Sequence, residues 1–433
     1  MTTGSYAPAG NGRIVIVALC GGADRPLAAL GGRTPFVAAE TPGLDRLAAR
    51  GCTGLLEVIA GGIPPESDSG AMALLGYDPL VHYTGRGPLE AYGNGYWDPD
   101  GYSVAFRVNF ASRDPRTGRL DRRTARDLSD GELSRMVEEI IAQIHLGEDI
   151  TVRLTGWGRH RGILAFSSRR WQLSGEVSNT DPGFAKSGAF GIPVPGHDNV
   201  PLSCEPLADD DGARRVATLV NSFVAQSARI MAASEVNARR VDSGRKPANM
   251  LLIRDGGHVL PRLSRSPMRI SMYGQVPAER GLARLIGARF TVARQTAGQD
   301  VAEFYRGLVS QLLADLADVV FAHIKAPDEP GHDGQPAAKV QAITDLDAGL
   351  VVPLQDALDP ADTLVVTCDH STPCELGIHA SDRVPAAVAG PGIAPDQVRV
   401  FSEPAALHGG LPVSRAQDLI RWLSTTRTDA ECR

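Results

Sequence analysis

The sequence predicts an α/β protein built on a doubly wound parallel sheet, with a second, smaller domain inserted into the chain. From about residue 249 onward, short apolar runs alternate with amphipathic helical stretches, which is typical of such a sheet. Near the N-terminus, residues 13–19 form an apolar run that indicates a buried, central parallel strand. Side chains able to bind metal follow two of the C-terminal runs, where open parallel sheets bind their ligands.

The elements follow in order along the chain. Gly21-Gly22 ends the first strand, and a short helix is expected from Pro42 to Ala49. A helical stretch follows at 70–75. Ser129 and Glu132 form a capping box that starts an amphipathic helix over 129–144. Further helices are expected over 216–231, 303–317 and 338–351, and further strands over 249–254, 319–324, 363–367 and 384–389.

The two ends of the chain are expected to build one sheet together, because the metal-binding side chains are C-terminal and the first strand is N-terminal. This places a discontinuous domain over 13–85 and 245–425, and an inserted domain over 86–243. The polar stretch 237–247 is interpreted as the linker between them. Residues 1–12 and 426–433 are expected to be flexible tails.

Composition excludes several classes of protein. With 433 residues, 43% of them hydrophobic and 22% charged, the chain can bury the cores of two domains. A net charge of -6 gives no electrostatic footprint for nucleic acid or an anionic membrane. The first apolar run is too short for a signal peptide or a membrane span. Six cysteines without a CxxC pair favour a reduced, cytoplasmic protein.

An aspartate and histidine constellation carries the strongest functional signal. Asp328 and His332 follow the apolar run 319–324, four residues apart, and Asp369-His370 directly follows the run 363–367 and Cys368. His379 lies a little further on. Carboxylate and imidazole groups at strand ends are ligands suited to manganese, zinc or cobalt. A lone Asp-x-x-x-His would be an ordinary polar loop, but the combination predicts a metal site.

A serine before the helical stretch at 70–75 is a candidate nucleophile. Ser67 lies between Glu66 and Asp68, where the helix dipole and a metal could activate its hydroxyl. The local sequence fits a plain capping serine equally well. Ser69 is the competing hydroxyl two residues on.

Arginine side chains are candidates for binding phosphate and carboxylate, because a guanidinium group can bind either anion through two hydrogen bonds. Taken one by one, they also fit a solvated surface. The candidate substrate-binding set is Arg86, Arg107, Asn109, Arg123, Arg126, His160 and Arg161.

Several collinear motifs resemble the archaeal-type cofactor-independent phosphoglycerate mutases of the alkaline phosphatase superfamily, over roughly residues 13–425. The matching pieces, beside the metal motifs, include Arg33-Thr34-Pro35, Thr41-Pro42-Gly43-Leu44-Asp45-Arg46-Leu47-Ala48, Ser67-Asp68, Leu75-Gly76-Tyr77-Asp78-Pro79, Tyr83-Thr84-Gly85-Arg86-Gly87-Pro88-Leu89-Glu90-Ala91, Phe106-Arg107-Val108-Asn109-Phe110-Ala111, His160-Arg161-Gly162, Asp181-Pro182 and Pro247-Ala248-Asn249.

The resemblance implies an alkaline-phosphatase-like metal domain with an inserted α+β substrate domain. It implies that Ser67 takes a phosphoryl group from 3-phosphoglycerate and returns it to the other hydroxyl. Two divalent ions are expected, manganese or zinc first and cobalt or magnesium as further candidates. One ion would be held by Asp328, His332 and His379, and the other by Asp369, His370, Ser67 and an aspartate after the first strand.

This sequence departs from the family's pattern at several positions around that site. Cys20 stands where the family has its aspartate, so it either binds metal as a thiolate or binds nothing, and Asp24 is too far along the chain to replace it. Arg280 stands where the family has a catalytic lysine at the substrate phosphate. The family's Arg-Gly-x-Gly appears as Arg254-Asp255-Gly256-Gly257.

Three functions follow as hypotheses. The first is a metal-dependent phosphoglycerate mutase with a serine relay, acting on a small phosphoglycerate-type substrate. The second is a homologue in phosphonate antibiotic (phosphinothricin-type) biosynthesis, passing a phosphonyl group such as phosphonoformyl from a nucleotide carrier to 3-phosphoglycerate; the change at Cys20 motivates it. The third is an inactive phosphoglycerate-binding protein.

Overall fold

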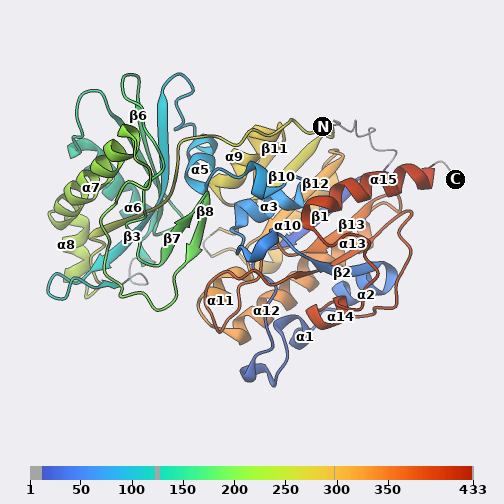
Figure 1. The fold of residues 1–433 in the computed structure, drawn as a ribbon. Helices are drawn as coiled ribbons and strands as arrows, with labels where there is room; N and C mark the ends of the chain where they lie inside the picture. The colour runs from blue at the N-terminus through green and yellow to red at the C-terminus, as the bar shows by residue number, and fades with distance from the viewer. Residues whose placement is uncertain (1–11, 122–126, 297, 432–433) are drawn as a thin grey trace. The chain divides into compact units, whose positions relative to one another are not determined.

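The chain folds into two compact units, shown in Figure 1. The computed structural model describes residues 12–121, 127–296 and 298–431. The first unit comprises Met1–Tyr83 and Arg262–Arg433, and the second comprises Thr84–Pro261. Residues 245–261, expected in the metal domain, therefore belong to the second unit. The physical reason is that the strand expected at 249–254 pairs with a strand of that unit.

The first unit is built on a seven-stranded sheet in the described part of the chain. Along the sheet the order is β11 (Arg289–Val292), β10 (Ile270–Gly274), β12 (Val319–Ile324), β1 (Ile14–Leu19), β13 (Thr363–Thr367), β14 (Val384–Ala389) and β2 (Cys52–Leu56). Strand β14 runs antiparallel to both of its neighbours, and the other pairings are parallel. Strand β1 is central, as predicted from its continuous apolar run.

Helices cover both faces of this sheet, since every residue of β1, β12 and β13 is buried. One group of helices packs together through residues 347–351. In a second group, α3 (Ser67–Leu74) packs against α9 (Pro277–Ile286), and both α3 and α15 (Leu419–Glu431) pack against residues 416–418. The first group is α2 (Pro42–Arg50), α10 (Val301–Ala314), α12 (Pro336–Leu346) and α13 (Val352–Ala357). The predicted fold class, a doubly wound α/β sheet with an inserted α+β unit, is confirmed.

The second unit is an antiparallel sheet with helices on both faces. Its strands are β3 (Tyr102–Arg113), β4 (Leu120–Asp121), β5 (Thr151–Trp157), β6 (Arg161–Ser168) and β9 (Met250–Gly257). One face carries the large apolar side chains of β3, β6 and β9, which form a core with α6 (Asp130–Gln143) and α7 (Asp211–Ala232). Against the other face packs α5 (Arg86–Gly93), through Ala91, Ala105, Ile163 and Ala165. A separate hairpin joins β7 (Phe184–Ser187) to β8 (Phe190–Pro193).

Two expectations about local structure are wrong. The stretch 237–247 is not a linker, because helix α8 (Glu235–Asp242) covers its first part. The Arg240 side chain is fully buried within the second unit, where Asp127 and Glu132 neutralise it. The C-terminal residues from 426 to 431 belong to helix α15 rather than to a tail.

Candidate active site

Three parallel strands bring the C-terminal motifs to one edge of the sheet. Strand β1 lies between β12 and β13, with Leu19 opposite Ile324 and Ala18 opposite Thr367. The residues that follow these strands therefore converge, although they are hundreds of positions apart in sequence. Cys20 follows β1, Asp328 follows β12 and Asp369 follows β13.

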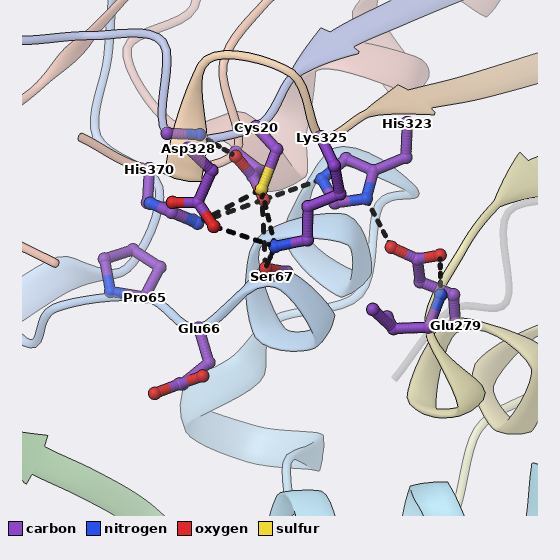
Figure 2. Close-up of polar contacts among 12 residues, drawn as sticks. Cys20, Pro65, Glu66, Ser67, Glu279, His323, Lys325, Asp328 and His370 are labelled. Atoms are coloured by element: carbon purple, nitrogen blue, oxygen red, sulfur yellow. Dashed lines mark hydrogen bonds and ion pairs between the residues drawn. The ribbon is translucent and has the colours of Figure 1, made fainter. Parts of the chain in front are cut away.

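Ser67, and not Ser69, lies in this cluster. Helix α3 begins at Ser67, and the Ser67 Oγ atom lies 3.5 Å from the Cys20 Sγ atom (Figure 2). The Ser69 hydroxyl is engaged at the helix start, where it accepts from the Glu66 backbone N–H and donates to the Glu66 carbonyl, both at 3.0 Å. The capping role considered for Ser67 thus belongs to Ser69.

Asp328, His332 and His379 form one group that fits a metal ion. The Nε2 atoms of the two histidines are 3.1 Å apart. The Asp328 Oδ1 atom lies 3.5 Å from His332 Nε2 and 3.8 Å from His379 Nε2. Ligand atoms about 2 Å from a shared ion have separations of this size. His332 Nδ1 is 2.9 Å from the carbonyl of Gly377, and His379 Nδ1 is 2.9 Å from that of Pro65. Donation to these carbonyls leaves both Nε2 lone pairs for the metal.

A second group combines Cys20, Asp369, His370 and Ser67. His370 Nε2 lies 3.4 Å from Asp369 Oδ2 and 3.5 Å from Cys20 Sγ. Cys20, Asp369 and His370 are completely buried. Cys20 lies close enough to two pairs of residues to share a metal ion with them. One pair is Asp328 and His370, and the other is His323 and Asp369. A sulfur, a carboxylate and an imidazole suit zinc or cobalt better than magnesium.

Lys325 occupies a central place that sequence reasoning did not assign to it. Its Nζ atom lies 2.7 Å from Ser67 Oγ, 3.0 Å from Cys20 Sγ and 3.1 Å from the Asp328 carboxylate (Figure 2). The signal was available, because Lys325 directly follows a predicted strand inside the metal motif. Its ammonium group places a positive charge beside the serine hydroxyl.

The charges of the cluster shift its ionisation strongly. Burial and the Asp369 carboxylate oppose ionisation of the Cys20 thiol, but the cations Lys325 and His323 outweigh them and lower its pKa. For His370, burial favours the neutral ring, yet Asp369 and Cys20 raise its pKa to about 9. Burial and the neighbouring His370 hold the pKa of His379 well below its usual range. The His379 ring is therefore neutral, as a metal ligand must be.

A buried chain of side chains supports Asp369 from behind. His323 Nε2 lies 2.7 Å from Asp369 Oδ2, and His323 Nδ1 contacts the Glu279 carboxylate (Figure 2). Glu279 also accepts from the backbone N–H groups of Gln275 and Val276, at 2.8 and 3.1 Å. A histidine inside an otherwise apolar strand was the available signal for His323. For Glu279, its place beside Arg280 was the only hint.

Two residues near the motifs lie apart from the cluster. Asp24 forms a buried ion pair with Lys339, with 2.8 Å between Oδ2 and Nζ, so it does not replace the missing aspartate. Arg280 is half-buried on α9, and its guanidinium carbon is 5.7 Å from the centre of the Phe290 ring. Among the described residues, no hydrogen bond or ion pair joins Arg280 to Ser67 or to either ligand group.

Three of the seven expected substrate-binding side chains gather on one face of the second unit's sheet. Asn109 is opposite Arg161 on β3 and β6, and Arg107 is opposite Arg254 on β3 and β9. Arg107 and Asn109 are two positions apart on β3, so they and the residues opposite them share one face of the sheet. This is the face on which α5 packs. Arg254 is an addition to the predicted set.

The remaining members of the set have different surroundings. Arg86 on α5 is buried and ion-paired with Glu90, at 2.7 Å between Nε and Oε1. His160 lies in the turn between β5 and β6, where its carbonyl accepts from the Phe110 N–H at 2.7 Å. Arg123 and Arg126 lie outside the described residues.

Comparison with known proteins shows the family to which the chain belongs. A family model described as 2,3-bisphosphoglycerate-independent phosphoglycerate mutase matches residues 48–237. The chain is 36% identical to an enzyme of that name from Methanoculleus marisnigri, covering 94% of this chain and 95% of that one. The chain belongs to this family. The enzyme of the same name from Aeropyrum pernix is 33% identical, covering 92% of this chain and 95% of that one.

Two solved structures show the same fold along nearly the whole chain. The cofactor-independent phosphoglycerate mutase from Thermoplasma acidophilum is 27% identical, with a TM-score of 0.57, covering 96% of this chain and 100% of that one. The PH0037 protein from Pyrococcus horikoshii is 27% identical, with a TM-score of 0.73, covering 96% and 97%. No described helix of this family member is long and apolar enough to cross a membrane.

Proposed function

We propose that the protein is a metal-dependent phosphoglycerate mutase that interconverts 3- and 2-phosphoglycerate through Ser67. The observation that carries the proposal is the position of the Ser67 hydroxyl. It lies at the start of helix α3, 2.7 Å from the Lys325 ammonium and 3.5 Å from the Cys20 sulfur, in a chain of the phosphoglycerate mutase family. A hydroxyl in these surroundings is a nucleophile for a phosphoryl group.

We assign the ligand side chains to two divalent ions. Asp328, His332 and His379 would hold one, and Cys20, Asp369, His370 and Ser67 would hold the other. When bound, such ions neutralise phosphoryl oxygens and stabilise an alkoxide. The first set suits manganese or zinc, whereas the sulfur of Cys20 favours zinc or cobalt in the second.

The chain's own groups prepare the serine. The Lys325 ammonium donates a hydrogen bond to Ser67 Oγ and stabilises negative charge on that oxygen. In the first transfer, a bond forms between Ser67 Oγ and phosphorus while the bond from phosphorus to the C3 oxygen breaks, and the serine hydroxyl proton ends on the C3 oxygen. In the second, the C2 hydroxyl oxygen bonds to phosphorus while the bond from phosphorus to Ser67 Oγ breaks, and the C2 hydroxyl proton ends on the serine. The helix dipole of α3 favours the negative phosphoryl group at its N-terminus.

The second unit carries a basic face of its own. Arg107, Arg161 and Arg254 lie on one face of its sheet, with Asn109 between them. Guanidinium groups bind carboxylate and phosphate through paired hydrogen bonds. This face is therefore the proposed binding surface for the phosphoglycerate acid.

Phosphorus NMR of the zinc- or manganese-loaded protein with 3-phosphoglycerate tests the proposal. The native chain is expected to form 2-phosphoglycerate, and a Ser67→Ala variant is expected to form none. Ser69→Ala is the matched control, because this hydroxyl is two residues away and only caps α3. Loss of activity in Ser69→Ala together with full activity in Ser67→Ala would overturn the assignment of the nucleophile.

The other two hypotheses make different forecasts in the same experiment. A phosphonyl transferase using a nucleotide carrier would leave 3-phosphoglycerate unchanged until such a donor is added, and a Cys20→Asp variant would gain mutase activity. An inactive binding protein would bind 3-phosphoglycerate but would not convert it, whether position 20 carries the native Cys20 or the Cys20→Asp change. The nucleotide-linked donor stays a prediction.

A further inference from the structure

Asp255 in the second unit has an unusual backbone conformation for a residue with a side chain. Its φ angle is 56°, in the left-handed region that favours glycine. It follows Arg254 near the end of β9, and its backbone N–H donates to Asn179 Oδ1 at 3.1 Å. Residues in such conformations cluster at functional sites, where the surroundings hold them in place.

The Asp255 carboxylate is buried and forms an ion pair, but it accepts no regular hydrogen bond from the described residues. The residue is 5% exposed, and neither carboxylate oxygen accepts a hydrogen bond from the described residues. Its close partner is the Arg254 guanidinium, with 3.0 Å between Nη1 and Oδ2. A buried carboxylate oxygen without a donor is costly, which makes it a candidate acceptor for a ligand.

The positive φ angle decides where this carboxylate lies. Neighbouring side chains on a regular strand point to opposite faces of the sheet. At Asp255 the alternation is broken, next to an irregular pairing between β9 and the Ala105–Arg107 part of β3. The Asp255 and Arg254 side chains consequently meet, and Arg254 is opposite Arg107 on the basic face.

Close backbone packing holds Asp255 in this position. A Cβ atom at Gly191 on β8 would lie 2.4 Å from Asp255 Oδ1, and one at Gly87 on α5 would lie 2.8 Å from the Asp255 carbonyl oxygen. The ring of Phe184 on β7 covers the Arg254 guanidinium, with 3.7 Å from its carbon to the ring centre. Gly191 thus leaves room for the Asp255 carboxylate, and Gly87 leaves room for the carbonyl oxygens of Ala105 and Asp255.

We propose that Asp255 accepts a hydrogen bond from a hydroxyl group of the bound substrate and thereby selects a hydroxyl-bearing phosphorylated acid. The assignment rests on the proposed function for the class of acid. Arginine side chains recognise the negative charges of the ligand, and a carboxylate beside them repels an anion unless that anion presents a donor. A hydroxyl group supplies that donor.

Asn109 supports this selection independently. Its side-chain oxygen is also buried and accepts no hydrogen bond from the described residues. Asn109 lies two residues from Arg107 on β3, on the same face. The basic face thus carries a second acceptor that lacks a donor, in addition to its guanidinium groups.

Titration calorimetry with two ligands tests the proposal. The ligands are 3-phosphoglycerate and 3-phosphonooxypropionate, which differ by one hydroxyl group, and a Ser67→Ala background prevents phosphoryl transfer. The chain with Asp255 is expected to prefer 3-phosphoglycerate by about tenfold or more. An added Asp255→Gly change, which suits the positive φ angle, is expected to remove most of this preference without lowering the melting temperature. Asp255→Asn, which keeps one oxygen acceptor, is expected to retain part of it.

Two further variants make the result specific. Asn199→Gly changes another residue of positive φ, 54°, and is expected to keep the full preference. Gly191→Ala is expected to weaken the preference, because its methyl group would displace the Asp255 carboxylate. An unchanged preference in Asp255→Gly, or no preference with Asp255 present, would overturn the proposal.

The mutase activity and the role of Asp255 can be tested independently of each other. A native chain that shows this preference but does not convert 3-phosphoglycerate would leave the role of Asp255 standing and remove the mutase activity. A chain that binds neither ligand would overturn both.

Discussion

The ammonium nitrogen of Lys325 lies 2.7 Å from the hydroxyl oxygen of Ser67. Strand β12 ends just before Lys325 and helix α3 begins with Ser67, so the contact joins two elements that are 258 positions apart in sequence. The same nitrogen lies 3.0 Å from Cys20 Sγ. A single cation thus stabilises negative charge on both the proposed nucleophile and the unusual cysteine.

Replacing Lys325 by glutamine is expected to slow phosphoserine formation by about a hundredfold to a thousandfold, the usual effect of losing one donor to a developing oxyanion. Lys325→Arg keeps the charge but changes the geometry, so an intermediate rate is expected. Rapid-quench measurement of phosphorylated protein in a single turnover checks both. A glutamine variant as fast as the native chain would show that this contact has no part in the transfer.

Cobalt loading is expected to reveal a sulfur ligand. If Cys20 binds the second ion, the cobalt-loaded protein will show a thiolate-to-cobalt charge-transfer band in the near ultraviolet, and Cys20→Ser will lose it. Cys374→Ser is the matched control, since burial and Asp24 raise the pKa of Cys374 to about 12 and keep it a thiol. A native spectrum without the band would mean that Cys20 binds no metal.

Metal binding to the second group is expected to release a proton and to strengthen as the pH rises to about 9. The reason is the His370 ring, whose pKa Asp369 and Cys20 raise to about 9 against the opposing effect of burial, so an incoming ion must displace its proton. Asp328 and His379 of the first group should release none, because the pKa of each lies well below its usual range. Calorimetry in buffers of different ionisation enthalpy measures the protons released. Binding that does not depend on pH between 6.5 and 9 would contradict this account.

The same ring makes the stability of the metal-free protein depend on pH. Since its pKa is raised from 6.5 to about 9 on folding, the His370 contribution to the free energy of unfolding is fully present below pH 6.5. It is lost as the pH rises through 9. Urea denaturation at several pH values checks this, and a His370→Gln variant should lose this part of the pH dependence.

Removing the Glu279 carboxylate is expected to weaken the second metal group selectively. In Glu279→Gln, His323 loses the carboxylate that orients it toward Asp369, and outer partners of this kind affect metal affinity by about tenfold to a hundredfold. The affinity of the Asp328 group should not change. Glu329→Gln, at an exposed position on α11 (Asp328–His332), is the control. Equal weakening of both groups would indicate a general structural defect instead.

Local sequence patterns were enough to predict most of the framework. The apolar runs of β1, β12 and β13 and the capping box of α6 depend on residues close together in the chain, so their spacing reveals them. The motifs after β12 and β13 predicted a metal site for the same reason, since parallel strands end at a common edge.

The tertiary structure decided the questions that depend on distant partners. Ser67 and Ser69 look alike in sequence, but positions two apart on a helix point about 200° apart, so only Ser67 faces the cluster. The stretch 237–247 read as a linker because it is polar, yet Arg240 is buried where Asp127 and Glu132 neutralise it from more than 100 positions away. Periodicity and capping act between neighbours and are written in the sequence by itself, whereas a buried charge is stable only if a distant partner compensates it, and that partner is known only once the chain is folded.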